Sequence, residues 1–125
     1  MGESVTFTDA ERPVVLLIDA HPDVLQRLTQ LLRLEPFLLH SATCAVEALA
    51  ILARHSVDLV MSAARLPDMD GASLLAHIHQ AYPHTVRILL TGETDLTLIV
   101  KAINEGEIYR YLSKPWKDEE LLLAL

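Results

Sequence analysis

Residues 57–71 read VDLVMSAARLPDMDG, an apolar run followed by a polar loop and then by a glycine. The run Val57–Met61 is short and, apart from Asp58, apolar, which is typical of a strand that is covered on both faces. Gly71 opens a helical pattern that Pro83 stops. The apolar residues that share one face of this helix are Leu74, Leu75 and Ile78. The stretch therefore predicts a buried strand, a loop and an amphipathic helix in succession.

The same succession recurs along the whole chain. The predicted strands cover residues 14–18, 37–41, 57–61, 86–90 and 108–112. The predicted helices cover residues 22–34 and 44–54, begin at Gly71, follow the stripe Leu96–Ile103, and begin again near Asp118. Five strands that alternate with five helices predict an α/β fold, with a doubly wound parallel sheet and helices on both faces.

Local residues mark several helix ends. Pro22 suits the first turn of a helix, and Asp23 favours its positive end. Thr43 is the predicted N-cap of the helix over 44–54. Pro36 breaks the first helix, and Gly106 fits the position just after the fourth.

Length and composition restrict the possible functions. The 125 residues suffice for one domain, and the hydrophobic fraction of 51% excludes a disordered chain. No apolar run approaches the roughly 18 residues of a membrane span. The formal net charge of −7 argues against nucleic-acid binding by this segment. The single cysteine, Cys44, is consistent with a reducing cytoplasm, which we expect as the location.

The chain divides into two unequal parts. Residues 1–12 are polar and aperiodic, so we expect a loose N-terminal arm, and residues 13–125 form the domain. The pattern stops abruptly at residues 121–125, from which we expect a truncation before an output domain.

Ligands of parallel α/β sheets bind beyond the carboxyl ends of the strands. That rule selects residues at four strand ends: Asp19-Ala20-His21, Ser62-Ala63, Thr91-Gly92 and Lys114.

These strand ends resemble the receiver domain of bacterial two-component response regulators. The resemblance rests on Ile18-Asp19, on residues 66–71 (LPDMDG), on Leu90-Thr91-Gly92 and on residues 111–115 (YLSKP), and it spans the chain from Val14 onward. It implies a flavodoxin-like strand order 2-1-3-4-5 and a role in phosphorelay signal transduction. Residues 102–111 (AINEGEIYRY) further resemble a subgroup whose receivers often precede cyclic-di-nucleotide phosphodiesterase or other output domains.

The resemblance also implies a Mg²⁺-dependent phosphoryl transfer to an aspartate, and here the sequence departs from the family. Asp19 matches the first residue of the acidic pair, but Ala20 stands in place of the second. Ala63 stands in place of the phosphoryl acceptor, and the carbonyl of Arg65 would be the remaining metal ligand. We therefore expect no phosphorylation by the family's mechanism, weak or lost Mg²⁺ binding, no other cofactor and no enzymatic activity.

Other family positions are kept. Thr91 matches the switch hydroxyl, Tyr111 the switch aromatic, and Lys114-Pro115 the lysine that pairs with phosphoryl oxygens and the proline that follows it. With no phosphoryl group, Lys114 is expected to pair with Asp19 as a modest salt bridge, in preference to binding an anion. Thr91 and Tyr111 are then open to a purely structural interpretation.

The sequence gives less support to several more specific hypotheses. Ser62 as a substitute acceptor is disfavoured, because neighbouring strand residues point to opposite faces. A metal site at His21 and Asp19 has too few ligands. His77 and His79 do not share a helix face, so both are expected at the surface. The remaining histidines, His40, His55 and His84, show no metal-ligand spacing, and Cys44 is expected to be a packed or idle thiol.

The sequence thus favours a degenerate receiver that acts as a protein-interaction or dimerisation module. The expected partners are a signalling protein or the chain's own output domain, and a second copy bound through the fourth helix, fifth strand and fifth helix. Two alternatives remain: a phosphorylatable receiver with an atypical acceptor, and a small-ligand sensor that uses the vacated pocket.

Overall fold

The computed structural model describes residues 12–33, 35, 37–91 and 110–113, and for Thr91 and residues 110–113 it describes the backbone. The strands are β1 (Val14–Ile18), β2 (Leu38–Ala42), β3 (Leu59–Ala63), β4 (Val86–Thr91) and β5 (Arg110–Ser113). The helices within the described residues are α1 (Pro22–Leu32), α2 (Ala45–Arg54) and α3 (Gly71–Ala81).

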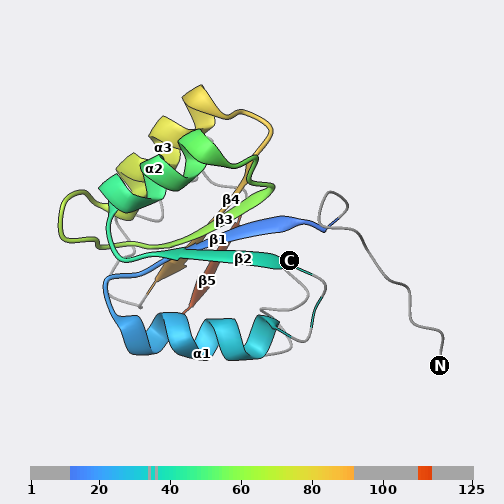
Figure 1. Cartoon of the computed structure of the whole chain (residues 1–125). Coiled ribbons are helices and arrows are strands. Elements are labelled where there is room, and N and C mark those ends of the chain that lie inside the picture. The colour runs from blue at the N-terminus through green and yellow to red at the C-terminus, as the bar shows by residue number, and fades with distance from the viewer. Residues whose placement is uncertain (1–11, 34, 36, 92–109, 114–125) are drawn as a thin grey trace.

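The strands form one parallel sheet in the order β2-β1-β3-β4-β5 (Figure 1). The predicted parallel, flavodoxin-like sheet with the order 2-1-3-4 is confirmed, and the backbone of β5 pairs beside β4. Because all strands run the same way, their carboxyl ends meet at one edge of the sheet. This edge is called the carboxyl edge below, and the opposite one the amino edge.

Helices cover both faces of the sheet. Figure 1 shows α1 on one face and α2 and α3 together on the other. Alternate strand residues enter the two cores. The core under α2 and α3 contains Leu16, Ile18, Ala48, Leu52, Val60, Leu74, Leu75, Ile78 and Leu89, and that under α1 contains Val15, Leu17, Leu25, Leu28, Leu32, Met61, Ile88 and Leu90.

The third strand lies two residues later than predicted. The backbone N–H of Asp58 donates to Val14 O at 2.8 Å, and ladder pairing begins at Leu59. Ser62 and Ala63, which the apolar run excluded, remain in the strand because they pair with Leu89 and Leu90 of β4. As a result, Ala63 is the last residue of β3 and not a loop residue.

Three other predicted boundaries shift as well. α1 ends at Leu32, two residues earlier than predicted, and β2 begins and ends one residue later than the predicted strand. Thr43 is not the N-cap of α2, since Cys44 holds that position. The Thr43 hydroxyl instead donates to Glu47 Oε1 at 2.9 Å, as does the Thr43 N–H at 2.8 Å.

Some predictions fall on residues outside those described. They include the arm over 1–11, the helix along 96–103, the final helix after Asp118, and most of the expected dimer face. Of the predicted last strand 108–112, the structure describes residues from Arg110 onward. Within the described part of the chain, no helix has the length and apolar character needed to cross a bilayer.

Candidate functional site

The carboxyl edge brings the ends of distant segments together. β1 and β3 pair up to Ile18 and Ser62, and β3 and β4 pair up to Ala63 and Leu90. The segments that follow β1 and β3 therefore emerge side by side. This is the place at which the sequence predicts the site.

Asp19 follows β1 and is 1% exposed. Its Oδ1 accepts a hydrogen bond from the backbone N–H of His21 at 2.9 Å, and its own N–H donates to Ala42 O at 3.1 Å. The carboxylate thus holds the turn that leads into α1, which begins with Pro22. Ala20, between these residues, supplies no oxygen from its side chain.

Ala63 ends β3 and is 4% exposed, so its methyl group is packed and not presented to solvent. A Cβ on Gly71 would overlap the carbonyl oxygen of Ala63, which explains why a glycine opens α3. The N–H of Gly71 donates to Ala64 O at 2.7 Å and fixes this close approach. The strand end and the start of α3 are consequently packed backbone against backbone.

Ser62 is fully buried, and its hydroxyl donates to the carbonyl oxygen of Ala63 at 2.9 Å. Ser62 lies on the strand face opposite to that of Ala63, because successive side chains of a strand alternate. The Ser62 hydroxyl is therefore hydrogen-bonded within the strand and is not accessible to a phosphoryl donor.

The loop between β3 and α3 contains two acidic residues that cap helices. Asp70 caps α3 and accepts from Ser73 N–H at 2.7 Å. Asp68 accepts from the N–H groups of Ala45 and Val46 in α2, at 2.8 and 3.0 Å. The N–H of Ala45, followed by that of Val46, lowers the pKa of Asp68 below its ordinary value. No local sequence pattern indicates this contact, because 23 residues separate Asp68 from Ala45.

The remaining positions of the predicted pocket are described in part. Arg65 is exposed and forms an isolated antiparallel bridge with Asp70. Thr91 is the last residue of β4, and Tyr111 of β5 pairs with Leu89 of β4. For Thr91 and Tyr111 the structure describes the backbone only. Lys114 and Pro115 lie outside the described residues, as does the predicted pairing of Lys114 with Asp19.

A Mg²⁺ ion fits this set of donors poorly. Mg²⁺ requires near-octahedral oxygen coordination and is usually held by one or two carboxylates together with phosphate oxygens. Asp19 is the one carboxylate among the three acidic positions of the family, and its Oδ1 already accepts from His21. Across the described residues, no three His, Cys, Asp or Glu side chains converge on a point that could hold a metal.

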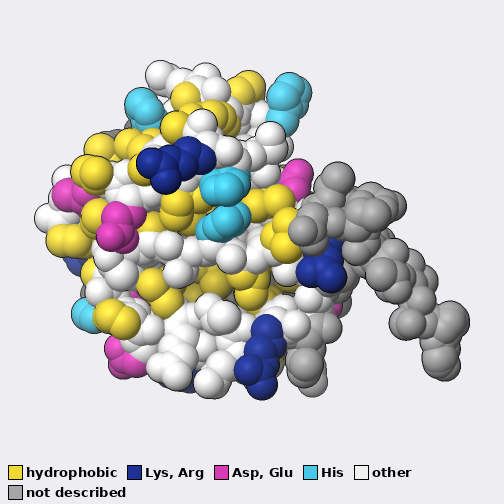
Figure 2. All heavy atoms as spheres, viewed as in Figure 1, with side chains coloured by type: hydrophobic (Ala, Val, Ile, Leu, Met, Phe, Trp, Pro, Cys, Tyr) yellow, Lys and Arg dark blue, Asp and Glu magenta, His cyan; other side chains and the backbone are white. Residues whose placement is uncertain are grey.

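The histidines separate into isolated and paired ones. His21, His77 and His79 are exposed, and for His77 and His79 this confirms the surface positions that the sequence predicts. The rings of His40 and His55 stack with their centroids 4.4 Å apart, and two touching histidine side chains are visible on the face in Figure 2. Burial, followed by the positive charge of His55, lowers the pKa of His40. Sequence spacing missed this pair because it joins β2 to the end of α2.

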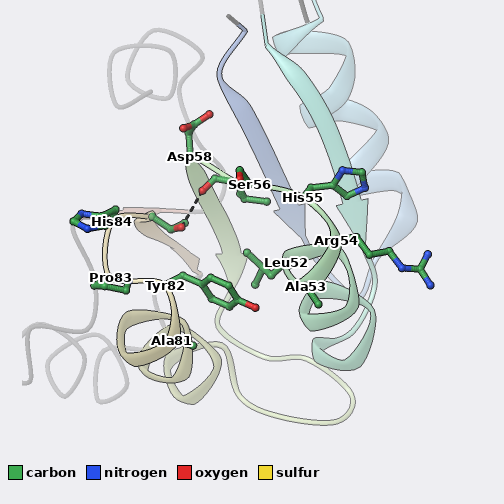
Figure 3. A pocket seen from close by; sticks show the side chains of 12 residues that line it. Leu52, Ala53, Arg54, His55, Ser56, Asp58, Ala81, Tyr82, Pro83 and His84 are labelled. Atoms are coloured by element: carbon green, nitrogen blue, oxygen red, sulfur yellow. Dashed lines mark hydrogen bonds between the residues drawn. The ribbon is translucent and has the colours of Figure 1, made fainter. Parts of the chain in front are cut away.

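The amino edge has a hydrogen-bond network and a groove. The Asp58 carboxylate accepts from Val14 N–H at 2.7 Å, and the buried Thr85 hydroxyl donates to Val57 O at 2.9 Å. The groove, of about 550 Å³, lies beside them between the ends of α2 and α3 (Figure 3). Figure 3 shows the Tyr82 ring directed from the end of α3 toward Ala53 of α2.

Residues 15–125 match the family described as response regulator receiver domain. The C4-dicarboxylate transport transcriptional regulatory protein DctD of Rhizobium meliloti is 36% identical over 110 residues, which are 88% of this chain and 24% of that protein. The transcriptional regulatory protein GlrR of Escherichia coli is 33% identical over 111 residues, which are 89% of this chain and 25% of that protein.

Solved structures resemble the fold closely. The crystal structure of the signal receiver domain of an HD domain-containing protein from Pseudomonas fluorescens Pf-5 is 65% identical, with 90% of each chain covered and a TM-score of 0.87. The chain spans a quarter or less of the length of the curated relatives named above.

Proposed function

The chain belongs to the response regulator receiver domain family, and from this premise we propose that it is a degenerate receiver of the bacterial cytoplasm. It takes part in two-component signalling by binding a protein partner, and it carries no phosphoryl group. One observation supports this most strongly: the residue that ends β3, where the family has its acceptor aspartate, is the packed Ala63. A methyl group has no oxygen with which to form an acyl phosphate.

The neighbouring positions support the same proposal. Phosphoryl transfer in this family depends on a metal that neutralises the developing charge. Ala20 removes one metal ligand and Ala63 removes another, while Asp19 is bonded to the turn before α1. The domain therefore lacks the means both to activate and to accept the phosphoryl group, and we propose no enzymatic activity and no resident Mg²⁺.

The runner-up functions receive less support. For an atypical acceptor, Ser62 would have to leave a fully buried position and break its bond to Ala63 O. A small-ligand sensor would need a pocket at the carboxyl edge, whereas the groove described above lies at the amino edge. Phosphorylation of the wild-type chain would favour the atypical acceptor over this proposal.

The partner is proposed to include an output domain of the same polypeptide. The curated relatives are transcriptional regulators several times longer than this chain. The 65% identical receiver belongs to an HD domain-containing protein, which favours an HD-type output. From the resemblance of residues 102–111, we propose that this output is of the cyclic-di-nucleotide phosphodiesterase class. Hydrolysis of a cyclic dinucleotide by the full-length protein would test the output type.

Homodimerisation through the fourth helix, β5 and the fifth helix is proposed as the second interaction. Light scattering of the purified domain over a concentration series tests it. A monomer at all concentrations would remove dimerisation from the proposal and leave the output domain as the partner.

Restoring the missing carboxylates tests the proposed function. The thermal midpoints of the wild type and of an Ala20→Asp/Ala63→Asp variant are compared with and without Mg²⁺ and beryllofluoride, which mimics a phosphoryl group. We expect a rise of several degrees in the variant, because ligand binding stabilises the folded state, and no rise in the wild type.

An Ala53→Asp/Ala81→Asp variant is the matched control. Both residues are exposed and line the groove at the amino edge, so the same two charges are added away from the pocket. A wild-type midpoint that rises with Mg²⁺ and beryllofluoride would overturn the proposal.

A further inference from the structure

The loop between β3 and α3 is tied to two different helices by two carboxylates. Asp70 caps the helix that follows it, through Ser73 N–H and the Ser73 hydroxyl, which donate at 2.7 and 2.9 Å. Asp68 reaches across to α2, where Oδ1 accepts from Ala45 N–H at 2.8 Å and Oδ2 accepts from Val46 N–H at 3.0 Å. The first is a local cap, and the second joins segments that are distant in sequence.

The two amides that Asp68 binds have no acceptor in their own helix. The first N–H groups of an α-helix always lack an intrahelical partner. Cys44, the N-cap of α2, bonds none of them through its side chain. The Asp68 carboxylate fills this role, and its negative charge also suits the positive end of the helix. The cap of α2 is thus supplied by the loop after β3.

Further contacts hold the same corner together. The side chain of Cys44 contributes to lowering the pKa of Asp68, after the larger effects of Ala45 and Val46. The other end of the loop is fixed by Gly71 N–H, which donates to Ala64 O at 2.7 Å. The loop is therefore anchored at its middle and at both ends by the protein's own groups.

We propose that Asp68 is a conformational clamp, which holds the β3–α3 loop against α2 in one position without a metal ion or phosphoryl group. This inference rests on the proposed function in one respect: a pocket that takes up neither ligand exerts no competing force on the loop. The clamp keeps the loop in the same position at all times, so the corner formed by the loop and α2 is not a switch.

Amide hydrogen exchange, measured by NMR in the full chain, tests the clamp where it acts. Asp68→Ala removes both acceptors, and we expect exchange of the Ala45 and Val46 amides to accelerate about fivefold, the factor that loss of an N-cap typically gives. The Ser73 amide should be unaffected. Asp70→Ala is the matched control, and it should accelerate Ser73 while leaving Ala45 and Val46 unchanged.

Asp68→Asn provides an intermediate variant, because its amide keeps one oxygen acceptor in place of two. We expect one of the two α2 amides to retain its protection. Equal exchange of Ala45 and Val46 in wild type, Asp68→Ala and Asp68→Asn would overturn the clamp.

The same amides report whether the loop moves. In the wild type, Mg²⁺ and beryllofluoride should leave the exchange of Ala45 and Val46 unchanged, and a change would contradict a loop held in one position. The two proposals fail separately. Loss of the clamp appears as unprotected α2 amides, whereas failure of the proposed function appears as phosphorylation or as ligand-dependent stabilisation.

Discussion

The two edges of the sheet differ in which acidic residues they retain. At the amino edge, the Asp58 carboxylate accepts from Val14 N–H at 2.7 Å and joins β1 to the start of β3. At the carboxyl edge, Asp19 keeps its carboxylate, but positions 20 and 63 hold alanine. The carboxylates that bond to backbone groups are present at both edges, whereas two that would serve metal and phosphoryl chemistry are absent.

This difference separates the scaffold of the fold from its chemistry. Asp58, Asp68 and Asp70 each satisfy backbone N–H groups that would otherwise lack an acceptor. The side chains of Ala20 and Ala63 accept no hydrogen bond from such N–H groups. Alanine in place of an acidic residue at these two positions therefore leaves the hydrogen bonds of the fold intact. The proposed loss of phosphoryl chemistry is therefore compatible with an intact architecture, since the two would depend on different residues.

The largest expected effect tests the packing of the carboxyl edge. Glycine to alanine within a helix normally stabilises by about 1 kcal/mol. In Gly71→Ala, the new Cβ overlaps the carbonyl oxygen of Ala63, so we expect a loss of about 3 kcal/mol in the free energy of unfolding. Urea unfolding measures it, and Gln80→Ala, at an exposed position of α3, should change stability by less than about 0.5 kcal/mol. Stabilisation by Gly71→Ala would show that the two backbones are not in contact.

A smaller effect is expected at the amino edge. Asp58→Ala removes the acceptor of Val14 N–H, and a net loss of about 1 kcal/mol follows from one backbone-to-carboxylate hydrogen bond at an exposed site. Urea unfolding of Asp58→Ala and Asp58→Asn measures it, with the Asn variant closer to wild type because it retains an oxygen acceptor. If neither variant loses stability, the hydrogen bond from Val14 N–H to Asp58 does not stabilise the amino edge.

The comparison also shows which parts of the fold the sequence could predict. Apolar periodicity located each helix and strand of the described region, since Leu74, Leu75 and Ile78 are all fully buried in α3 as predicted. It failed at the ends of β3, because the small residues Ser62 and Ala63 carry no hydrophobic signal and are kept in the strand by pairing with β4.

The candidate site, like the fold, could be predicted from the sequence only in part. Asp19 and Ala63 could be placed at the carboxyl edge from strand ends alone. The Asp68 contact with α2 and the stacking of His40 on His55 could not, because both depend on tertiary packing between segments without a shared sequence pattern. Long-range side-chain contacts of this kind appear only when the elements are assembled.

The smallest expected effect is a pH dependence near the amino edge. The pKa of His40 lies below its ordinary 6.5, so the unfolded chain binds this proton more readily than the folded one. The stability contributed by neutral His40 is therefore fully present above pH 6.5 and is lost as the pH falls through that value toward the lowered pKa. Asp68 and Glu47, whose pKa values are also lowered, lose their contributions only below their ordinary 3.8 and 4.5.

Thermal midpoints from about pH 7 down to about pH 5 measure this effect. His55→Asn removes the charge that faces His40 and should reduce the loss without abolishing it, since burial is the larger cause. His77→Asn, at an exposed position on α3, is the control. Identical pH profiles for all three proteins would show that the stacked pair does not influence stability.

The lack of a phosphoryl acceptor at Ala63 is tested by the intact mass of the wild-type chain after incubation with acetyl phosphate and Mg²⁺. We expect no added phosphoryl group in the wild type, and a phosphoryl adduct in the Ala20→Asp/Ala63→Asp variant under the same conditions. A wild-type mass raised by one phosphoryl group, with no such increase in Ser62→Ala, would show that the chain is phosphorylated and identify Ser62 as the acceptor.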